Sequence, residues 1–446
     1  MYCYMDMDMD MDMDMDMDIK HGFINKSNIK YVVTNTKCGD EVVALIRVNV
    51  GSRDEADELK GMSHLLEHMF FRGTEKYPTQ SDLTSVLYRC GGGFNAYTSL
   101  DTTVFHITVS KKCIEEGLDI LADSFYNSLF REEDLEKEKK IVINEINDYL
   151  SDPSTLMYYG LSELMYKGTR LEKDIAGLSR TIRSIDIDMM KNFINTYYQK
   201  DVVVSISGNV DCQKMVLLIK KFFKKKIHYD VKKVNKLITN DKKRELYPQL
   251  LMKQKIFQTK FVKKSEEQSF LGIGFTSYDH NDPKKHSLMI ITEMLTGYLG
   301  SELYKVLRGE KGLVYGVQAG MDTFIDTGDF SITCSTENDS DKVNQCIVII
   351  LNELKKIKMG EINEKLFADT KKNSIITIKD MKYSPESLAI KYADDLIYSK
   401  KVISLDELQQ NIKSVTIESV INVANELFTP EKLCICYTGS NILHLR

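Results

Sequence analysis

The sequence predicts a mixed α and β protein with two domains. Segments with the alternating pattern of strands and segments with the three-to-four spacing of helices are both abundant along the chain. With 446 residues the chain exceeds a single-core domain, and its 43% apolar content suffices for two cores. The order of elements in the first half returns in the second half, which indicates a diverged internal duplication.

The first 20 residues are predicted to form a disordered tail. A strict Met-Asp repeat covers Met5 to Asp18, and it is acidic throughout without a core pattern. It has neither the Arg- and Ser-rich composition of a transit peptide nor the apolar core of a signal peptide. A cytoplasmic location is therefore expected, with a mitochondrial location left open.

Residues 21–228 are predicted to form the first domain. Their apolar patterns indicate alternating strands, helices with one apolar side, and a glycine run that ends one of the helices. The predicted strands cover 30–34, 41–49, 102–110 and 202–208, and the predicted helices cover 62–70, 79–89, 115–127, 132–150, 185–197 and 213–225.

A lysine-rich connector is predicted at 229–264, because periodic patterns are weak there, and a second domain is predicted at 265–446. A long helical region at 283–307 is interrupted by glycines and carries His286 and Glu293 at a spacing unsuited to a metal site. The other predicted elements are strands at 269–276, 315–324, 328–335 and 432–439, and helices at 341–357, 363–381, 405–412 and 417–427.

Charge and cysteine usage exclude several classes of protein. A net charge of −5 without a recognised nucleic-acid module argues against nucleic-acid binding. No apolar run approaches the roughly 18 residues of a membrane span. Nine scattered cysteines without a secretory signal indicate free thiols in a reducing compartment. Cys434 and Cys436 are expected to be core residues on one face of the last strand.

The most informative motif is His64-Leu65-Leu66-Glu67-His68. In a helix, the two imidazoles lie one turn apart on the same face, where both reach one Zn²⁺ at about 2.0–2.1 Å. Glu67 then lies beside the open position of the metal, where it can act on a bound water. A lone histidine is more often an ordinary surface or core residue, but the pair with an intervening glutamate is typical of zinc hydrolases.

A catalytic zinc needs a third protein ligand, and the helix at 132–150 offers two candidates. Glu138 and Glu145 lie one heptad apart and border the apolar stripe of that helix, so both need a partner. A single glutamate on so charged a helix is usually solvated, and spacing alone does not choose between the two.

The chain resembles the pitrilysin and mitochondrial-processing-peptidase family, the inverzincins. The resemblance is carried by residues 61–74 around the motif, by the Gly-rich turn and strand at 91–99, and by 136–146, where Glu145 stands 77 residues after His68. It implies that His64, His68 and Glu145 hold one Zn²⁺ per chain. It further implies that Glu67 is the general base and Glu138 an auxiliary carboxylate.

The resemblance extends to the second half. Residues 303–308 and 312–317 are similar to the segment that brings an arginine and a tyrosine to the substrate, which implies those roles for Arg308 and Tyr315. Where many relatives have Ser-Arg-Leu, this chain has Glu302 in the middle position, so no role is assigned to it. An extended peptide substrate is expected along an edge strand, at Phe94, Asn95, Ala96 and Tyr97.

The resemblance implies an α+β fold of two domains, each a largely antiparallel sheet backed by helices, that face each other across a cleft. The expected function is zinc-dependent endopeptidase action on unfolded segments or short peptides, in a dimer with an identical or related subunit. The alternative is a catalytically silent assembly subunit of the same fold, but such proteins typically lose the metal-binding residues that this chain retains. A glycine-rich substrate-recruiting subunit is disfavoured, since 296–303 has no long glycine loop.

Overall fold

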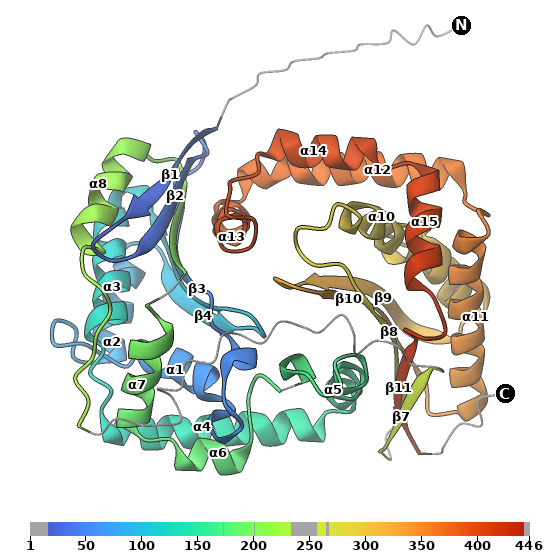
Figure 1. The fold of residues 1–446 in the computed structure, drawn as a ribbon, viewed down its shortest axis with the longest axis horizontal. Coiled ribbons are helices and arrows are strands. Elements are labelled where there is room, and N and C mark those ends of the chain that lie inside the picture. The colour runs from blue at the N-terminus through green and yellow to red at the C-terminus, as the bar shows by residue number, and fades with distance from the viewer. Residues whose placement is uncertain (1–16, 173, 200, 233–256, 265–266, 441–446) are drawn as a thin grey trace, which may run out of the picture.

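Two mostly antiparallel sheets, one in each half of the chain, form the framework of the molecule (Figure 1). The computed structural model describes residues 17–172, 174–199, 201–232, 257–264 and 267–440. The first sheet contains β1 (Asp18–Ile24), β2 (Ile29–Asn35), β3 (Glu41–Val48), β4 (Gly93–Thr98), β5 (Thr103–Ser110) and β6 (Val202–Gly208). The second contains β7 (Gln258–Lys263), β8 (Gln268–Ser277), β9 (Val314–Thr323), β10 (Gly328–Glu337) and β11 (Cys434–Gly439).

The two sheets share one strand order. The first runs β1-β2-β6-β3-β5-β4 and the second β7-β11-β8-β10-β9, so the second repeats the first without its outermost strand β1. In both sheets the first strand of the repeat pairs in parallel with the last one, and the remaining pairs of the repeat are antiparallel. The predicted α+β class and the predicted duplication are therefore confirmed, and β4 and β9 are equivalent edge strands.

Helices connect and cover these strands. In the first half they are α1 (Met62–Phe70), α2 (Gln80–Arg89), α3 (Ile114–Asn127), α4 (Glu132–Ser151), α5 (Pro153–Met165), α6 (Ser179–Ser184), α7 (Ile187–Tyr197) and α8 (Cys212–Phe222). In the second half they are α10 (Lys285–Thr296), the π-helix η6 (Tyr304–Glu310), α11 (Ser340–Lys358), α12 (Glu364–Asp380), α13 (Pro385–Asp394), the π-helix η8 (Asp395–Ser399), α14 (Leu405–Ser414) and α15 (Ile417–Leu427). None of the described helices is both long and apolar enough to cross a membrane.

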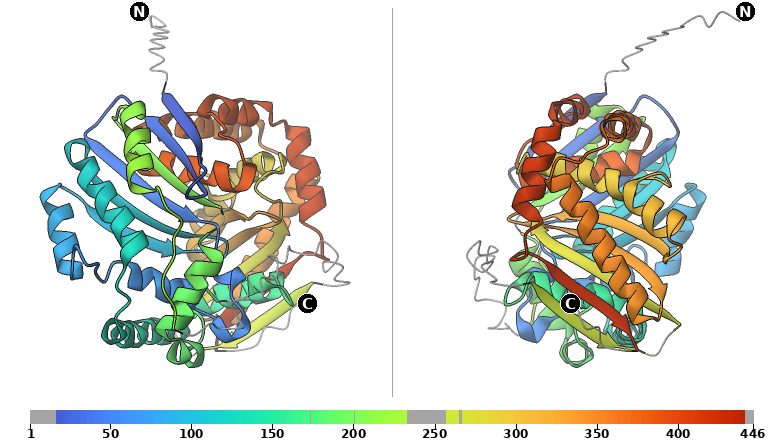
Figure 2. Two further views of the ribbon diagram at one scale, coloured as in Figure 1. Left: turned by 60° about the vertical axis from the view of Figure 1, so that its left-hand side comes forward. Right: turned by 90° about the vertical axis from the view of Figure 1, so that its right-hand side faces the viewer.

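The halves exchange one helix each. Helix α5 of the first half packs against β7, β8 and β11 of the second sheet, and α13 of the second half packs against β2, β3 and β6 of the first. The other faces are covered within each half, by α3 and α8 on the first sheet and by α11 and α15 on the second (Figure 2). Every sheet therefore needs both halves of the chain to bury its two faces.

Strand β3 shows why this exchange suits the sequence. Val42, Ala44 and Ile46 point into the core of the first half, while Val43 and Leu45 point into the core that contains the second half. A strand buried on both faces is apolar at successive positions instead of alternating with polar residues. On β11, Cys434 and Cys436 are buried against α5, which confirms their predicted place in the core.

Buried ion pairs also join the halves. Arg53 donates to Asp101 in the first half and to both carboxylate oxygens of Asp326 in the second, with each N–O distance 2.8 Å. The arginine and Asp101 side chains are 1% exposed and Asp326 is 8% exposed. A second ion pair between the halves joins Arg47 on β3 to Asp394 at the end of α13, with an N–O distance of 2.5 Å.

Two boundaries of the predicted organisation are wrong. Asp18, Ile19 and Lys20 belong to β1, where they pair with β2, so the tail predicted for residues 1–20 cannot include these three residues. Residues 1–16, which make up nearly all of the rest of the predicted tail, lie outside the described ranges. The predicted connector at 229–264 contains β7, because its residues complete a parallel pair with β11. The strand was not recognised in the sequence because the segment is rich in lysine. Most of the predicted connector, residues 233–256, lies outside the described residues.

Candidate metal centre

Helix α1 presents its polar face toward a second helix. Met62, Leu65, Leu66 and Met69 are fully buried in the first core, which leaves the opposite side of the helix to the two histidines and Glu67. The carboxylate of Glu55 accepts from the backbone N–H groups of Gly61 and Ser63, each at 2.7 Å. It therefore satisfies two backbone N–H groups at the start of the helix. Its negative charge also stabilises the positive N-terminal end of the helix dipole.

Helix α4 supplies the acidic residues opposite. Its first turn contains three acidic residues, which stabilise the helix N-terminus. Leu135, Val142 and Ile146 anchor it in the core. The same side carries Glu138, whose side chain is fully buried, and Glu145, whose side chain is one-third exposed.

The structure brings together His64, His68 and Glu145. The two Nε2 atoms are 3.3 Å apart, and Glu145 Oε2 lies 3.7 Å from each of them. Three ligand atoms at about 2.05 Å from a tetrahedral Zn²⁺ are separated by about 3.3 Å. The spacing of the three donor atoms therefore fits one zinc ion, and no other such group of three occurs among the residues that the structure describes.

The hydrogen bonding of this cluster supports the same conclusion. Glu145 Oε2 is buried, and no hydrogen-bond donor of the described residues reaches it. A buried carboxylate oxygen without a donor is costly unless a cation lies beside it. One carboxylate oxygen and two ring nitrogens that converge on one point form the donor set that a divalent metal requires.

The protonation state of His64 and the hydrogen bond at Nδ1 of His68 suit metal binding. Burial and the neighbouring His68 lower the pKa of His64 to about 4, so this ring is neutral at pH 7. For His68 burial lowers the pKa, but the hydrogen bond with Glu138 and the nearby carboxylates raise it overall. Because His68 Nδ1 lies 3.0 Å from Glu138 Oε2, its proton belongs on Nδ1, and Nε2 is left to face the cluster.

Glu138 thus binds the far side of His68 and does not join the three donor atoms. Its second oxygen pairs with Arg72, which lies two residues beyond the end of α1. The arginine balances the charge of this fully buried carboxylate. Sequence reasoning did not identify Arg72, although its spacing of four residues from His68 would place it on the same face.

Glu67 lies on the same face of α1 and has a different partner. Its Oε2 accepts a hydrogen bond of 2.7 Å from the hydroxyl of Thr98, the last residue of β4. Burial raises the pKa of Glu67 above its usual value, with the Thr98 hydrogen bond opposing that change. The residue is half-buried, so the carboxylate is accessible beside the histidines.

Strand β4 forms the free edge of the first sheet, as expected for the proposed substrate strand. The Phe94 ring stacks on Phe71 at 4.1 Å, and the Tyr97 hydroxyl lies 3.4 Å from Arg47. Ala96 is half-buried, and Asn95 is exposed. Most side chains of this strand are therefore engaged in packing. The Asn95 side-chain oxygen accepts a hydrogen bond of 2.9 Å from the backbone N–H of Ala96, so a ligand at this edge would compete for that N–H group.

The structure does not bring Arg308 and Tyr315 into contact with the metal cluster among the described residues. Arg308 lies exposed on η6, with its guanidinium 5.8 Å from the ring of Tyr304. Tyr315 is 52% exposed near the start of β9, the strand equivalent to β4. Both side chains are thus free to meet a ligand, and their roles stay predictions.

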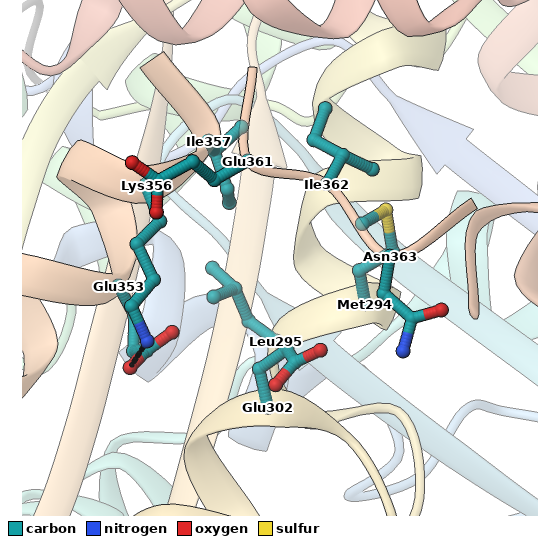
Figure 3. Close-up of a pocket in the computed structure, with 9 residues that line it drawn as sticks. All are labelled: Met294, Leu295, Glu302, Glu353, Lys356, Ile357, Glu361, Ile362 and Asn363. Atoms are coloured by element: carbon teal, nitrogen blue, oxygen red, sulfur yellow. Dashed lines mark hydrogen bonds and ion pairs between the residues drawn. The ribbon is translucent and has the colours of Figure 1, made fainter. Parts of the chain in front are cut away.

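A separate pocket lies in the second half, between α10 and α11 (Figure 3). It encloses about 220 Å³ and is lined by Glu302, Glu353, Glu361 and Lys356 among apolar residues. Lys356 pairs with Glu353 at 2.8 Å, so two of these charges neutralise each other. None of the residues of the metal cluster lines this pocket.

Comparison with known proteins gives a consistent result along the chain. Residues 31–178 match the insulinase (peptidase family M16) domain, and residues 184–374 match the domain described as the peptidase M16 inactive domain. A zinc protease of Bacillus subtilis, itself uncharacterized, is 28% identical over 91% of this chain and 95% of its own. The beta subunit of the mitochondrial-processing peptidase of Dictyostelium discoideum is 32% identical over 48% of this chain and 46% of its own.

Solved structures agree on the fold. A protease from Helicobacter pylori superposes with a TM-score of 0.84 at 21% identity, over 95% of this chain and 99% of that one. A putative M16-like peptidase from Alicyclobacillus acidocaldarius gives a TM-score of 0.78 over 95% of this chain. With both domain matches in chain order and this fold, the chain belongs to peptidase family M16, the insulinase or pitrilysin family, and is similar to its zinc proteases.

Proposed function

We propose that this protein is a zinc-dependent endopeptidase that hydrolyses unfolded segments or short peptides. One observation carries the proposal: the donor atoms of His64, His68 and Glu145 lie 3.3 to 3.7 Å apart, around a buried carboxylate oxygen without a hydrogen-bond donor. The zinc-protease names of full-length relatives support the same metal and reaction class.

In this proposal each polar residue at the facing sides of α1 and α4 has a separate role. His64, His68 and Glu145 hold the metal, and Glu138 fixes the ring of His68 through Nδ1. A zinc ion held there would supply Lewis-acid chemistry, since it would polarise a scissile carbonyl and lower the pKa of a water to near neutral pH. Glu67 accepts the proton of that water and delivers it to the leaving amine.

Substrate binding is proposed to use β4 and the second half together. An extended peptide pairs with main-chain groups of the edge strand β4 and takes the place of the Asn95 side-chain oxygen at the Ala96 N–H, while the exposed Asn95 side chain contacts the peptide. Arg308 and Tyr315 then bind the substrate carbonyl or the developing oxyanion. Recognition through the main chain gives broad sequence tolerance and selects unfolded chains, because a folded segment cannot add to a sheet edge.

The test is to compare the wild type with Glu67→Gln on a fluorogenic peptide while measuring bound metal. The variant should retain zinc and lose turnover by about 10²–10⁴-fold, since it lacks the proposed base. Glu133→Gln on the exposed side of α4 is the matched control and should equal the wild type. Wild-type turnover in Glu67→Gln, or no cleavage of any peptide by the zinc-loaded wild type, would refute the proposal.

A dimer is also proposed, because one relative is named as a subunit of the mitochondrial-processing peptidase. Analytical ultracentrifugation of the purified chain should give about twice the mass of 51.3 kDa if the partner is a second copy. A monomer that becomes active only with an added related chain would instead indicate a heterodimer. The cytoplasmic location stays a prediction.

A further inference from the structure

We propose that Thr98 is a positioning residue for Glu67, and that it couples the substrate strand to the catalytic base. The inference rests on the proposed function, because it assigns Glu67 the role of base. Its starting point is the 2.7 Å hydrogen bond from Thr98 Oγ1 to Glu67 Oε2, which links residues 31 positions apart. Hydrogen bonds to ionised carboxylates are among the stronger ones in proteins.

The packing of β4 on α1 fixes this hydrogen bond at both ends. Phe94 and Thr98 lie four residues apart on one face of the strand, and Glu67 and Phe71 lie four residues apart on or just beyond the helix. Phe94 stacks on Phe71 at 4.1 Å, so the aromatic pair anchors one end while Thr98 meets Glu67 at the other. A slip of the strand by one residue would turn both side chains to the opposite face.

The turn after Thr98 is held independently. Ser99 N donates to Thr102 O at 2.8 Å, and the backbone oxygens of Ser99 and Leu100 accept from Ser52 N and Arg53 N, each at 3.1 Å. Within this turn, Asp101 is buried and accepts both from Arg53 and, at 3.1 Å, from the backbone N–H of Ile325 in the second half. Thr98 therefore sits between an aromatic anchor and a turn that both halves of the chain immobilise.

This arrangement allows the Thr98 hydroxyl to orient the Glu67 carboxylate. One oxygen of Glu67 is held by Thr98, so the carboxylate cannot rotate freely, and its other oxygen keeps a fixed direction for proton transfer. Correct placement of a base within hydrogen-bond reach is a requirement for efficient general-base catalysis. A peptide that pairs with β4 would stabilise the same strand that holds the base, so binding and alignment would occur together.

The experiment compares Thr98→Val, which removes the hydroxyl but keeps the shape, with Thr98→Ser, which keeps it. Thr98→Val should lower kcat by about tenfold to a hundredfold, while KM stays within about twofold and zinc content is unchanged. Thr98→Ser should restore kcat to within about threefold of wild type. This rescue separates the hydroxyl from any general effect of substituting the strand.

Thr103→Val is the matched control, because Thr103 is the direct cross-strand neighbour of Thr98. Its hydroxyl bonds to Val50 O at 2.9 Å and does not touch Glu67, so this variant should keep wild-type kcat. The proposal is overturned if zinc-loaded Thr98→Val retains wild-type kcat, if Thr98→Ser is as slow as Thr98→Val, or if Thr103→Val is equally slow. If the wild type cleaves no peptide or Glu67→Gln is fully active, the proposed function itself fails.

Discussion

The two halves of the chain have the same strand order and different chemistry on equivalent helices. In the first half, α1 follows β3 and carries His64, Glu67 and His68; in the second, α10 follows the equivalent strand β8 and carries His286 and Glu293 seven residues apart. A group of three metal-binding side chains occurs only in the first half of the described chain. The same arrangement of strand and helix therefore occurs in both halves, and a few side chains on the helix decide whether it can bind a metal.

The largest expected effect separates the histidines of the two halves. His68→Ala should abolish stoichiometric zinc binding and lower peptide turnover by about a thousandfold or more, because a donor atom of the cluster is lost. His286→Ala removes a histidine from the equivalent helix of the second half and should retain both properties. Metal analysis and a fluorogenic assay would measure them, and equal zinc in wild type and His68→Ala would show that the site is assigned wrongly.

The next prediction concerns the ion pairs between the halves. Asp326→Asn should lower the free energy of unfolding by about 3 kcal/mol, because it removes one of the two carboxylates that balance the buried Arg53, and with it a bidentate pair, while Asp101 stays in place. Glu337→Gln breaks the exposed pair with Lys342 and should leave the urea midpoint close to that of the wild type, because solvent screens exposed ion pairs. Urea unfolding measures both. Equal midpoints for the two variants would contradict a stabilising role for the buried pair.

A smaller effect should distinguish buried carboxylates of the two halves. Glu138→Gln weakens the hydrogen bond that orients His68 and should reduce zinc affinity by about 10–100-fold. Glu353→Gln alters a buried carboxylate of α11 that pairs with Lys356, and it should leave zinc affinity unchanged. Competition with a chromogenic chelator gives both affinities. If the two variants bind zinc equally well, Glu138 has no special role beside His68.

The last prediction uses the pH dependence of a carboxyl group in the second half. Burial, with a contribution from Asp322, raises the pKa of Asp329 to about 7 from an ordinary value of 3.8. The folded state thus keeps a proton that the unfolded chain loses near pH 4, so this stabilisation is complete at low pH and is lost as pH rises from about 4 to 7. Asp329→Asn does not titrate, yet its amide oxygen can still accept from Tyr166.

Relative to the wild type, Asp329→Asn should therefore gain stability between pH 5 and pH 8, by up to a few kcal/mol. Urea unfolding at both pH values, with chelator present throughout so that metal loss does not contribute, measures this difference. A constant difference between the two proteins across that range would show that Asp329 titrates at its ordinary pKa.

Most elements could be predicted from the sequence, and those that could not depend on distant partners. The strands that became β3 and β6 contain apolar runs, and β5 has several apolar residues broken by His106 and Thr108, so the local pattern reveals all three. Helix α5 was not predicted, although its buried Met157, Leu161 and Met165 recur at the four-residue spacing of one helix face. A Cβ at Gly160 would lie 2.5 Å from the Cys436 sulfur, so that glycine is explained only by a strand some 275 residues away.

The candidate site divides in the same way. The spacing within His64–His68 is local to one helix turn and was predictable, whereas the spacing of Glu138 and Glu145 did not select the third ligand without the family resemblance. The structure places the two carboxylates at the two different nitrogens of His68. The contacts of Thr98 and Arg72 were missed, since a hydrogen bond between a strand and a helix leaves no periodic signal.

The exchanged helices have a consequence for how this protein is made. When the first half leaves the ribosome, one face of its sheet still lacks α13, which is encoded almost 180 residues after β6 ends. The nascent chain must therefore expose an apolar sheet surface, including Val43 and Leu45, until synthesis nears completion. Chaperones that shield such surfaces should matter more for this protein than for one whose domains close in turn.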